Sequence, residues 1–570
     1  MKLTQAPNLN HLWAGLMVEE FIRNGVDYFC ISPGSRSSPL VCAVAANPRA
    51  KTFVHFDERG LAFHALGYTS AARKPCVLIC TSGTAAANFF PAIVEASKRK
   101  LPLIILTADR PHELRFTGAN QTIDQIKMFG DYVRFFFDMP TPTKDIAPEF
   151  ILTTIDQAIF RGQGELPGPV HLNCPFREPL APIATKEKFT AYLQSIQKWN
   201  KAGTPYTKYV TPERNINARE IENVIRILES SKKGLIAVGK LSSAQEGETV
   251  LKLAQKLNWP IFPDITSGLR LGCVHQNVIS YFDQILLQKN LTKPDCVLHL
   301  GGRMTSQRFY DYISKAAPQN YITVLNHPLR NDPLHSVSLR LQAKVDIFCK
   351  GIEKNISKKK ESAFLKLFQR ANQKAAQRLD QSLASFSEAS VARGLSKILP
   401  QNSGLFLASS LPIRHMDRYA VPNGKKVIVS SNRGASGIDG TIASAAGFAQ
   451  GLRRPTTLLI GDLAFLHDLN SLAMLKNLTT PFVIVVLNNN GGGLFSLLPI
   501  ARYENKDIFK RFFLTPHDLH FEAVSKMFKL NYVFPQTKDN FLTAYQYALK
   551  NNSPAVIEIK INQKENPSNL

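Results

Sequence analysis

Cysteine and tryptophan are scarce in this chain, and the pattern of its cysteines excludes one class of site. Eight cysteines and three tryptophans occur among 570 residues. The cysteines show none of the paired spacings of a zinc site, and most lie in apolar runs that are typical of strands. We therefore expect them to be small buried side chains of a protein in a reducing compartment.

The sequence also has no uninterrupted apolar run long enough to span a bilayer, which takes about 20 residues. Its mean hydropathy is -0.11 and 44% of its residues are apolar, which is typical of a globular protein. Residues 1–13 lack the apolar core of a secretory signal. These absences predict a cytoplasmic protein without a membrane span.

Acidic residues are few relative to basic ones. The 69 Lys and Arg against 44 Asp and Glu give a formal net charge of +25, a balance that can indicate a nucleic-acid or anionic-membrane partner. The basic residues do not form one patch interleaved with aromatic side chains. Their densest run, Lys354–Lys360, falls where a connection between domains is expected. We therefore expect a solvated basic surface and no nucleic-acid partner.

A chain of this length is too long for one core, and its pattern predicts about three domains of α/β class. Strand-loop-helix units repeat from Tyr28 to about Phe176, and similar units follow a polar, irregular stretch. We expect a mostly parallel sheet with helices on both faces in each domain. The expected boundaries are domains at 1–185, 213–353 and 387–570, a linker at 186–212 and a basic helical linker at 354–386.

The most informative stretch, Pro455–Pro499, places two oxygen ligands at the ends of two strands joined by one helix. Pro455–Gly461 and Phe482–Leu487 are apolar runs typical of buried strands, and Leu463–Leu478 has helical apolar spacing. A right-handed crossover makes the strands parallel, so that Asp462 and Asn489 emerge at one sheet edge. With a carbonyl oxygen from the turn at Gly491, these are too few ligands for an all-protein cage. They suit Mg²⁺, which takes further ligands from water and phosphate.

This GD…NN arrangement resembles the metal motif of thiamine diphosphate enzymes, in which the metal, Mg²⁺ or Mn²⁺, connects the protein to the cofactor's diphosphate. It departs from many of them at Leu463, where they have glycine. The alternative for this segment alone is an ordinary doubly wound unit whose Asp462 caps a helix and whose Asn-Gly run is a turn.

A second element of such a site is a carboxylate that hydrogen-bonds the aminopyrimidine ring of the cofactor. Glu58 lies just past a short strand and before an apolar helix, which is where the resemblance places that glutamate. A strand-end acid beside an arginine is more often a solvated ion pair. The order of Glu58 relative to the following motifs favours the cofactor role.

Six segments closely resemble one family of thiamine diphosphate enzymes, the 2-succinyl-5-enolpyruvyl-6-hydroxy-3-cyclohexene-1-carboxylate synthases of menaquinone biosynthesis. The resemblance extends from Leu12 to about Ile559. It implies a pyrimidine-binding first domain, a central domain and a diphosphate- and metal-binding third domain. The segments are ISPGSRSSPL (31–40), FDERGL (56–61), TSGTAAAN (81–88), TADRP (107–111), GANQ (118–121) and SNRGASGIDG (431–440).

The resemblance implies decarboxylation of 2-oxoglutarate and 1,4-addition of the succinyl carbanion to isochorismate. The product is 2-succinyl-5-enolpyruvyl-6-hydroxy-3-cyclohexene-1-carboxylate, released with carbon dioxide. It also implies a homodimer or homotetramer with shared active sites. The alternatives are another thiamine-dependent 2-oxoacid decarboxylase or acetohydroxyacid synthase, and a binding or nucleic-acid-associated protein that kept the scaffold. A binding protein has no need of the activating acid Glu58.

Both substrates are dicarboxylates, for which planar guanidinium groups are the expected partners. The resemblance assigns catalytic roles to Glu58, Gln121, Arg414 and Arg433. It assigns substrate contacts to Ser35, Arg36, Arg110, Asn120, Arg308, Ser410, Phe495 and Leu498. Read singly, each arginine is as well explained by a surface ion pair. Two positions depart from some relatives, which have a basic residue in place of Gln307 and a larger polar residue in place of Gly493.

The remaining expected cofactor contacts surround the metal motif. Ile438 matches the bulky apolar residue that wedges beneath the cofactor, although core packing is its alternative. Leu494, Phe495 and Leu498 follow the turn at Gly491 and would exclude water from the reacting carbon. The full set implied for the cofactor is Glu58, Ser410, Ile438, Gly461, Asp462, Asn489 and Leu494, with Asp462, Asn489 and Gly491 on the metal.

Overall fold

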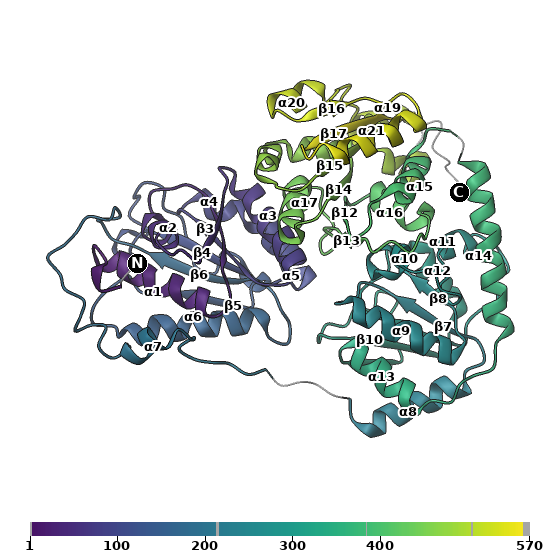
Figure 1. Ribbon diagram of the computed structural model, residues 1–570, viewed down its shortest axis with the longest axis horizontal. Helices are drawn as coiled ribbons and strands as arrows, with labels where there is room; N and C mark the ends of the chain where they lie inside the picture. Colours follow the sequence, from purple (N-terminus) through teal and green to yellow (C-terminus); the bar gives the residue numbers. More distant parts are fainter. Residues whose placement is uncertain (1–2, 212–215, 384, 503–504, 562–570) are drawn as a thin grey trace. The chain divides into compact units, whose positions relative to one another are not determined.

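The computed structural model describes residues 3–211, 216–383, 385–502 and 505–561. Its strands form three sheets, and every strand pair in them is parallel (Figure 1). Strands alternate with helices along most of the chain, which is the order that parallel crossovers require. The expected α/β class with three parallel sheets is confirmed.

The first sheet has the strand order β2-β1-β3-β4-β6-β5. Helices α1, α2 and α6 share one apolar core beside it, and α3 contacts the sheet at β1 and β3. Its strands are β1 (Tyr28–Ile31), β2 (Lys51–Val54), β3 (Cys76–Cys80), β4 (Leu103–Asp109), β5 (Phe135–Asp138) and β6 (Val170–Pro175). Its helices are α1 (Leu9–Arg23), α2 (Ser38–Ala45), α3 (Glu58–Ala72), α4 (Thr84–Asn88), α5 (Phe90–Arg99), α6 (Pro148–Gln163) and α7 (Gln197–Ala202).

The second sheet has the order β11-β10-β9-β7-β8 and an apolar core on each face. Its strands are β7 (Gly234–Val238), β8 (Ile261–Pro263), β9 (Cys296–Leu300), β10 (Asn320–Leu325) and β11 (Leu339–Gln342). Its helices are α8 (Ala218–Ser230), α9 (Ala244–Leu257), α10 (Leu269–Gly272), α11 (Phe282–Ile285), α12 (Gln307–Ala316) and α13 (Val345–Asn355), followed by the long α14 (Ala363–Ser382).

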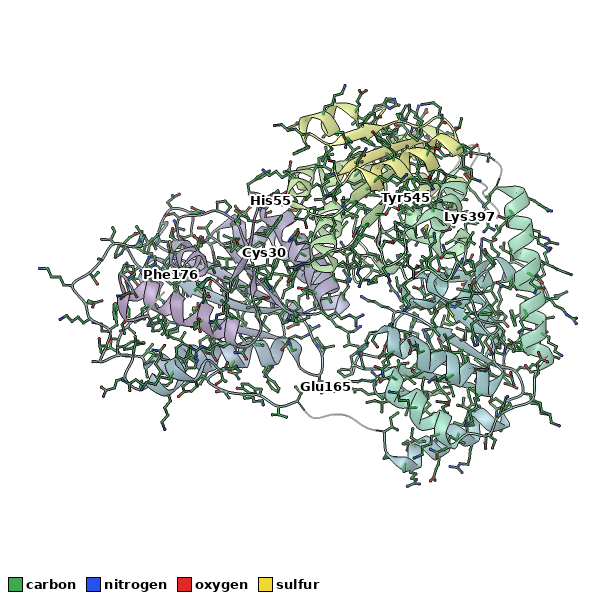
Figure 2. The ribbon with its side chains drawn as sticks, viewed as in Figure 1. Cys30, His55, Glu165, Phe176, Lys397 and Tyr545 are labelled. Carbon is green, nitrogen blue, oxygen red and sulfur yellow. The ribbon has the colours of Figure 1, made fainter. Side chains whose placement is uncertain are left out.

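The third sheet has the order β13-β12-β14-β15-β17-β16. Tyr545 of α21, labelled in Figure 2, is fully buried and lies 2.6 Å from the Thr457 hydroxyl of β14. The strands are β12 (Gly404–Leu407), β13 (Ile428–Ser430), β14 (Thr456–Gly461), β15 (Phe482–Asn488), β16 (Asn531–Val533) and β17 (Ala555–Lys560). The helices of this part are α15 (Glu388–Ile398), α16 (Leu411–Tyr419), α17 (Thr441–Leu452), α18 (Asp462–His467), α19 (Lys506–Phe509), α20 (Glu522–Met527) and α21 (Lys538–Lys550).

The strands are buried because both faces of each parallel sheet must be covered. All residues of β3, β4 and β15 are buried. The segment expected as a linker, 186–212, contributes Phe189 and Trp199 to the first core. The eight cysteines carry free thiols and six are buried, among them Cys30 of β1 (Figure 2). No helix of the described residues is long and apolar enough to cross a membrane.

Two compact units emerge from the contacts within the chain. The first comprises residues 1–211, 432–453 and 464–479, and the second comprises 212–431, 454–463 and 480–570. In the first unit α17 packs directly on α3. A Cβ on Gly67 would lie 1.9 Å from the Ser444 carbonyl oxygen, and one on Gly447 equally close to that of His64. Glycine is therefore required where these two helices touch.

The segment expected as one helix over Leu463–Leu478 is interrupted. Helix α18 ends at His467, and η5 (Leu469–Asn477) continues as a 3-10 helix. The fully buried carboxylate of Asp468 lies between them, where it accepts hydrogen bonds from the Ala443 amide and the Ser471 hydroxyl. This interaction with α17 competes with a continuous helix, and burial raises the pKa of Asp468 to about 6.

A buried histidine in the first unit predicts loss of stability in acid. His64 of α3 stacks on Phe53 and receives or donates one hydrogen bond at the Tyr28 hydroxyl, 3.1 Å away. Its Nδ1 atom is buried without a hydrogen-bond partner among the described residues. Burial, with a smaller effect of His55, lowers the pKa of His64 to about 3.

Because the folded protein holds His64 neutral, the unfolded chain takes up a proton first as the pH falls below about 6.5. This contribution to stability is present above that pH and is lost progressively toward pH 3. At pH 5 the loss is about 2 kcal/mol in the free energy of unfolding. Urea titrations should show that the free energy of unfolding of the parent protein falls between pH 7.5 and pH 5. In His64→Gln this fall should be smaller by the same amount. An identical fall in both proteins would contradict the prediction.

Candidate functional site

Two oxygen-bearing side chains lie at the carboxyl edge of the third sheet. β14 and β15 are neighbours with Gly461 in register with Leu487. Asp462 follows the first strand directly and Asn489 follows the second, and both are buried. The structure thus brings these two expected metal ligands together.

The carboxylate of Asp462 is held by backbone amides and one histidine. Its Oδ1 accepts from the Leu463 amide at 2.7 Å, and its Oδ2 accepts from the Gly491 amide at 2.9 Å. The Nε2 atom of His517 lies 3.2 Å from Oδ2. Burial raises the pKa of Asp462, while the hydrogen bonds from Gly491, Leu463 and His517 act in the opposite direction. These contacts fix the carboxylate in one orientation.

The carboxamide of Asn489 is oriented by a buried carboxylate. Its Nδ2 atom donates to Oε1 of Glu388 at 2.8 Å. Oε2 of the same glutamate lies 2.7 Å from Nε2 of His415. Glu388 is the first residue of α15 and is fully buried. The Oδ1 atom of Asn489 therefore belongs to the end of the carboxamide that does not face Glu388.

Glycines at the turn after β15 give the expected metal ligands their space. Gly491 has a φ of 131° and a Cβ there would lie 2.0 Å from the Leu514 carbonyl oxygen. A Cβ on Gly493 would lie 2.6 Å from Nδ2 of Asn489. A larger residue at this position would displace that carboxamide in this backbone conformation. Gly461 faces open space among the described residues, since a Cβ there would meet nothing within 4 Å.

The donor set fits a hard cation that is completed by a phosphate ligand. A carboxylate, a carboxamide oxygen and a backbone carbonyl are oxygen ligands of the kind that Mg²⁺ prefers. Among the described residues, no group of three or more His, Cys, Asp or Glu side chains could hold a metal ion. The residues at the ends of β14 and β15 are too few to enclose an ion by themselves, and they suit one that takes further ligands from phosphate and water.

Glu58 begins α3 in the first unit. Asp57 caps the helix, accepting from the amides of Arg59 at 3.0 Å and Gly60 at 3.4 Å. The hydroxyl of the fully buried Ser32, just past β1, donates to Oε1 of Glu58 at 2.9 Å. Helix capping and this hydrogen bond together fix where the Glu58 carboxylate lies.

The loop of Arg433 and Ile438 is anchored to α5 in the same unit. The buried Glu95 accepts from the amides of Gly434, Ala435 and Ser436 at 2.8, 2.6 and 3.4 Å. Ile438 is 38% exposed, so that plain core packing does not explain it. Arg433 is half-buried on this loop.

Two guanidinium groups converge in the loops at the carboxyl ends of the first sheet. Arg110 donates to the Ser82 hydroxyl and, at 3.0 Å, to the Gln121 carbonyl oxygen. Arg36 donates to the Phe176 carbonyl oxygen at 2.9 Å. Burial and the nearby positive charge of Arg36 lower the pKa of Arg110. An anion between such groups would relieve their repulsion.

Neutral side chains lie on the same loops. Gln121 is exposed, with a φ of 56°, and its Nε2 donates to the Ser82 carbonyl oxygen at 3.0 Å. Ser35 and Asn120 are exposed. These loops thus present exposed polar groups beside the two guanidinium groups.

In the second unit, Arg308 is held by a buried carboxylate that also binds the neighbouring domain. Asp283 is 3.1 Å from Nε of Arg418 on α16 and forms a shorter contact with Nη1 of Arg308 on α12. The Ser306 hydroxyl donates to its other oxygen. Asp283 therefore ties the helix that carries Arg308 to the helix that carries Arg414. Gln307 is directed to Asp311, with 3.0 Å between Nε2 and Oδ1.

Helix α16 starts from a strained residue. Ser410, its N-cap, has a φ of 73°, a left-handed conformation that is uncommon for a residue other than glycine. One helical turn later, Nη1 of Arg414 donates back to the Ser410 carbonyl oxygen. The two predicted site residues thus adjoin each other at the helix start.

The apolar residues after the metal turn are partly accessible. Leu494 and Phe495 are half-buried in η6 (Gly493–Leu497), and Phe495 packs edge-on against Phe513 with 5.7 Å between ring centroids. Leu498 is 41% exposed. Exposed apolar side chains beside the expected metal ligands are suited to covering a bound molecule.

Several residues in these contacts were not expected from the sequence, among them Ser32, Glu95, Asp283 and Glu388. Each of these four acts through a predicted residue or loop rather than by facing the site. Ser32 lies within the SPGSRSSPL motif, which is a signal that could have found it. The three acids are buried, yet in the sequence they resemble ordinary helix residues.

Family models for thiamine pyrophosphate enzymes match nearly the whole chain. The N-terminal thiamine pyrophosphate-binding domain matches residues 13–128, the middle domain residues 190–407 and the C-terminal thiamine pyrophosphate-binding domain residues 413–559. The cofactor is named in the descriptions of all three domains, and the N-terminal and C-terminal domains are described as binding it.

Three relatives that align over nearly their full length share the name 2-succinyl-5-enolpyruvyl-6-hydroxy-3-cyclohexene-1-carboxylate synthase. The protein from Rubrobacter xylanophilus is 44% identical over 566 residues, which cover 98% of this chain and 97% of the relative. The one from Prosthecochloris aestuarii is 41% identical over 560 residues, covering 97% and 95%. The one from Salinibacter ruber is 41% identical over 572 residues, covering 98% and 95%.

Proposed function

Since the chain belongs to the 2-succinyl-5-enolpyruvyl-6-hydroxy-3-cyclohexene-1-carboxylate synthase family of thiamine diphosphate enzymes, we propose that its own residues perform that reaction. The reaction is decarboxylation of 2-oxoglutarate followed by 1,4-addition of the succinyl carbanion to isochorismate. The observation that carries the proposal is the pair Asp462 and Asn489 at the ends of adjacent parallel strands, with Gly491 turning beside them.

Thiamine diphosphate, when bound, supplies the electron sink that makes a carbanion accessible from a 2-oxoacid. Asp462, Asn489 and the Gly491 carbonyl would hold its divalent metal, Mg²⁺ or Mn²⁺. Glu58 would accept or donate a proton at the aminopyrimidine ring, and Ser32 keeps its carboxylate in place at 2.9 Å. Ile438, Ser410, Gly461 and Leu494 would contact the cofactor.

The arginines would bind the carboxylates of the two substrates. Arg414, with Ser410, is proposed for the 2-oxoglutarate carboxylate, and Arg433 assists it. Arg36, Arg110 and Arg308 are proposed for isochorismate, together with Ser35, Asn120 and Gln121. Phe495 and Leu498 would exclude water from the reacting carbon. Bidentate guanidinium contacts suit a dicarboxylate better than a neutral acceptor.

Product identification tests this function. The protein is mixed with thiamine diphosphate, Mg²⁺, 2-oxoglutarate and isochorismate, and the products are identified by mass spectrometry. The expected product joins the succinyl unit left after loss of carbon dioxide to the isochorismate ring and retains the enolpyruvyl group. Succinic semialdehyde alone would indicate a simple decarboxylase. In a parallel mixture with pyruvate in place of both substrates, an acetolactate-type product would indicate an acetohydroxyacid synthase.

We further propose a homodimer or homotetramer in which Glu58 of one subunit serves the metal site of another. Mixtures of inactive Glu58→Ala and inactive Asp462→Ala chains should then recover activity, because hybrid subunit pairs contain one intact site. The mixtures are assayed after subunit exchange has been shown by native mass spectrometry. Exchange without any recovered activity would oppose shared sites.

The eight free cysteines support a reducing, cytoplasmic location.

A further inference from the structure

Two buried glutamates in the third domain bind two successive asparagines. Glu388 of α15 accepts from Nδ2 of Asn489 at 2.8 Å, and Glu558 of β17 accepts from Nδ2 of Asn488 at 2.7 Å. Both glutamates are fully buried, and each also lies beside a histidine. Only Asn489 is a proposed metal ligand, so Glu558 serves as the comparison for Glu388. Glu558 additionally accepts from the Phe521 amide and the Tyr532 hydroxyl, each at 2.8 Å.

An ionised carboxylate can only accept hydrogen bonds, whereas a carboxamide has a donor end and an acceptor end. Glu388 therefore selects the amino end of Asn489 and turns its oxygen in the other direction. A flipped carboxamide would set its oxygen against the Glu388 carboxylate and present an N–H₂ group, which cannot ligate a cation, at the ligand position. Orientation of this side chain is thus decisive for metal binding.

The carboxamide is restrained on two sides. Gly493 lies against it so closely that a Cβ there would be 2.6 Å from Nδ2 and 3.0 Å from Cγ. Glu388 is itself held by His415, whose Nε2 is 2.7 Å from Oε2. The His415 ring stacks on Tyr419 of the same helix, with centroids 5.7 Å apart. The restraint on Asn489 therefore extends into α15 and α16.

We propose that Glu388 is a positioning residue for the metal site, which fixes the carboxamide of Asn489 so that its oxygen faces the cation. The inference rests on the proposed metal role of Asn489 and extends it to a residue outside the metal motif. Groups that orient metal ligands typically contribute 10- to 100-fold to metal affinity.

Metal affinity is the direct readout. Mn²⁺ is titrated in the presence of saturating thiamine diphosphate, and free Mn²⁺ is measured by electron paramagnetic resonance. Glu388→Ala is expected to weaken Mn²⁺ binding by about 10- to 100-fold. The matched control Glu558→Ala removes an equally buried carboxylate from Asn488 and should leave Mn²⁺ affinity unchanged. Equal affinity in Glu388→Ala and the parent protein, or equal losses in both alanine variants, would overturn the proposal.

A second pair of variants keeps the test decisive if Glu388→Ala does not fold. Glu388→Gln can still accept from Asn489 while its amino group faces Nε2 of His415, so affinity should stay within about threefold of the parent. In an Asn489→Asp background there is no amino end to select, and Glu388 repels the new carboxylate. There Glu388→Gln should strengthen Mn²⁺ binding. A merely structural role for Glu388 predicts no strengthening in the Asn489→Asp background, and that result would refute the proposal.

Asp462→Ala separates this inference from the proposed function. If the parent protein binds no Mn²⁺ in a thiamine diphosphate-dependent way, or binds it equally after Asp462→Ala, the metal site itself is wrong. If Asp462→Ala abolishes binding while the Glu388 variants do not change it, the metal site stands and the positioning role of Glu388 is wrong.

Discussion

Replacing Glu58 by glutamine is expected to lower turnover by about 10²–10⁴-fold, which is the usual contribution of a positioned acid or base. The amide keeps the shape of the side chain but cannot exchange a proton with the aminopyrimidine ring. Because this interaction acts on chemistry more than on binding, the affinity for thiamine diphosphate should stay within about tenfold of the parent. Turnover is measured by product formation and affinity by quenching of tryptophan fluorescence.

A neighbouring carboxylate provides the control for Glu58. Asp57 precedes it, caps α3 and accepts from the amides of Arg59 and Gly60. Asparagine caps helices as well as aspartate does, so Asp57→Asn removes one negative charge next to Glu58 with little structural cost. Its turnover should stay close to that of the parent. Near-normal turnover in Glu58→Gln would end the assigned role of this glutamate.

Arg414→Ala and Arg110→Ala are expected to damage different halves of the reaction. Losing one bidentate charged contact costs on the order of 2–4 kcal/mol for the substrate concerned, or roughly 30- to 900-fold. Arg414 adjoins Ser410 at the start of α16, and its loss should slow the decarboxylation of 2-oxoglutarate measured without isochorismate. Arg110 lies on the loops of the first sheet, and its loss should leave that half-reaction intact and impair only carbon-carbon bond formation.

Rapid-mix measurements of carbon dioxide release and steady-state measurements of the coupled product distinguish the two half-reactions. Arg226→Ala, an exposed position on α8, is the charge-matched control and should change neither. Equal damage to both half-reactions by Arg414→Ala and Arg110→Ala would show that the arginines act together on both substrates through one shared positive potential. The division of substrates between them would then be wrong.

The predictions from the sequence that describe the fold depend on short-range patterns. The apolar runs at 455–461 and 482–487 correspond to β14 and β15, and three parallel sheets follow from the repeated strand-helix order. Asp462 and Asn489 meet because a single crossover connects their strands, which makes the geometry local in the chain. A motif of this kind is therefore sufficient to predict from the sequence that two strand ends lie side by side.

The residues that orient the site come from contacts that are distant in sequence. Glu388 is 101 residues from Asn489, and Glu95 is 339 residues from Gly434. The sequence around an acidic residue in a helix does not indicate whether its side chain will face solvent or a buried amide. The 3-10 segment after His467 likewise arises because Asp468 binds the amide of Ala443, a residue of another helix. Local propensity does not encode that partner.

The sequence by itself thus determined the fold class, the family and the positions of Glu58, Asp462 and Asn489, because each depends on a motif and its place at a strand end. Only the tertiary structure decided how these groups are oriented. Ser32 for Glu58, Glu388 for Asn489 and Asp283 for Arg308 become visible once helices and strands have packed. The physical reason is that a buried hydrogen bond requires a donor–acceptor distance within a few tenths of an ångström and a favourable angle at the hydrogen. Only the packed chain fixes that distance and that angle.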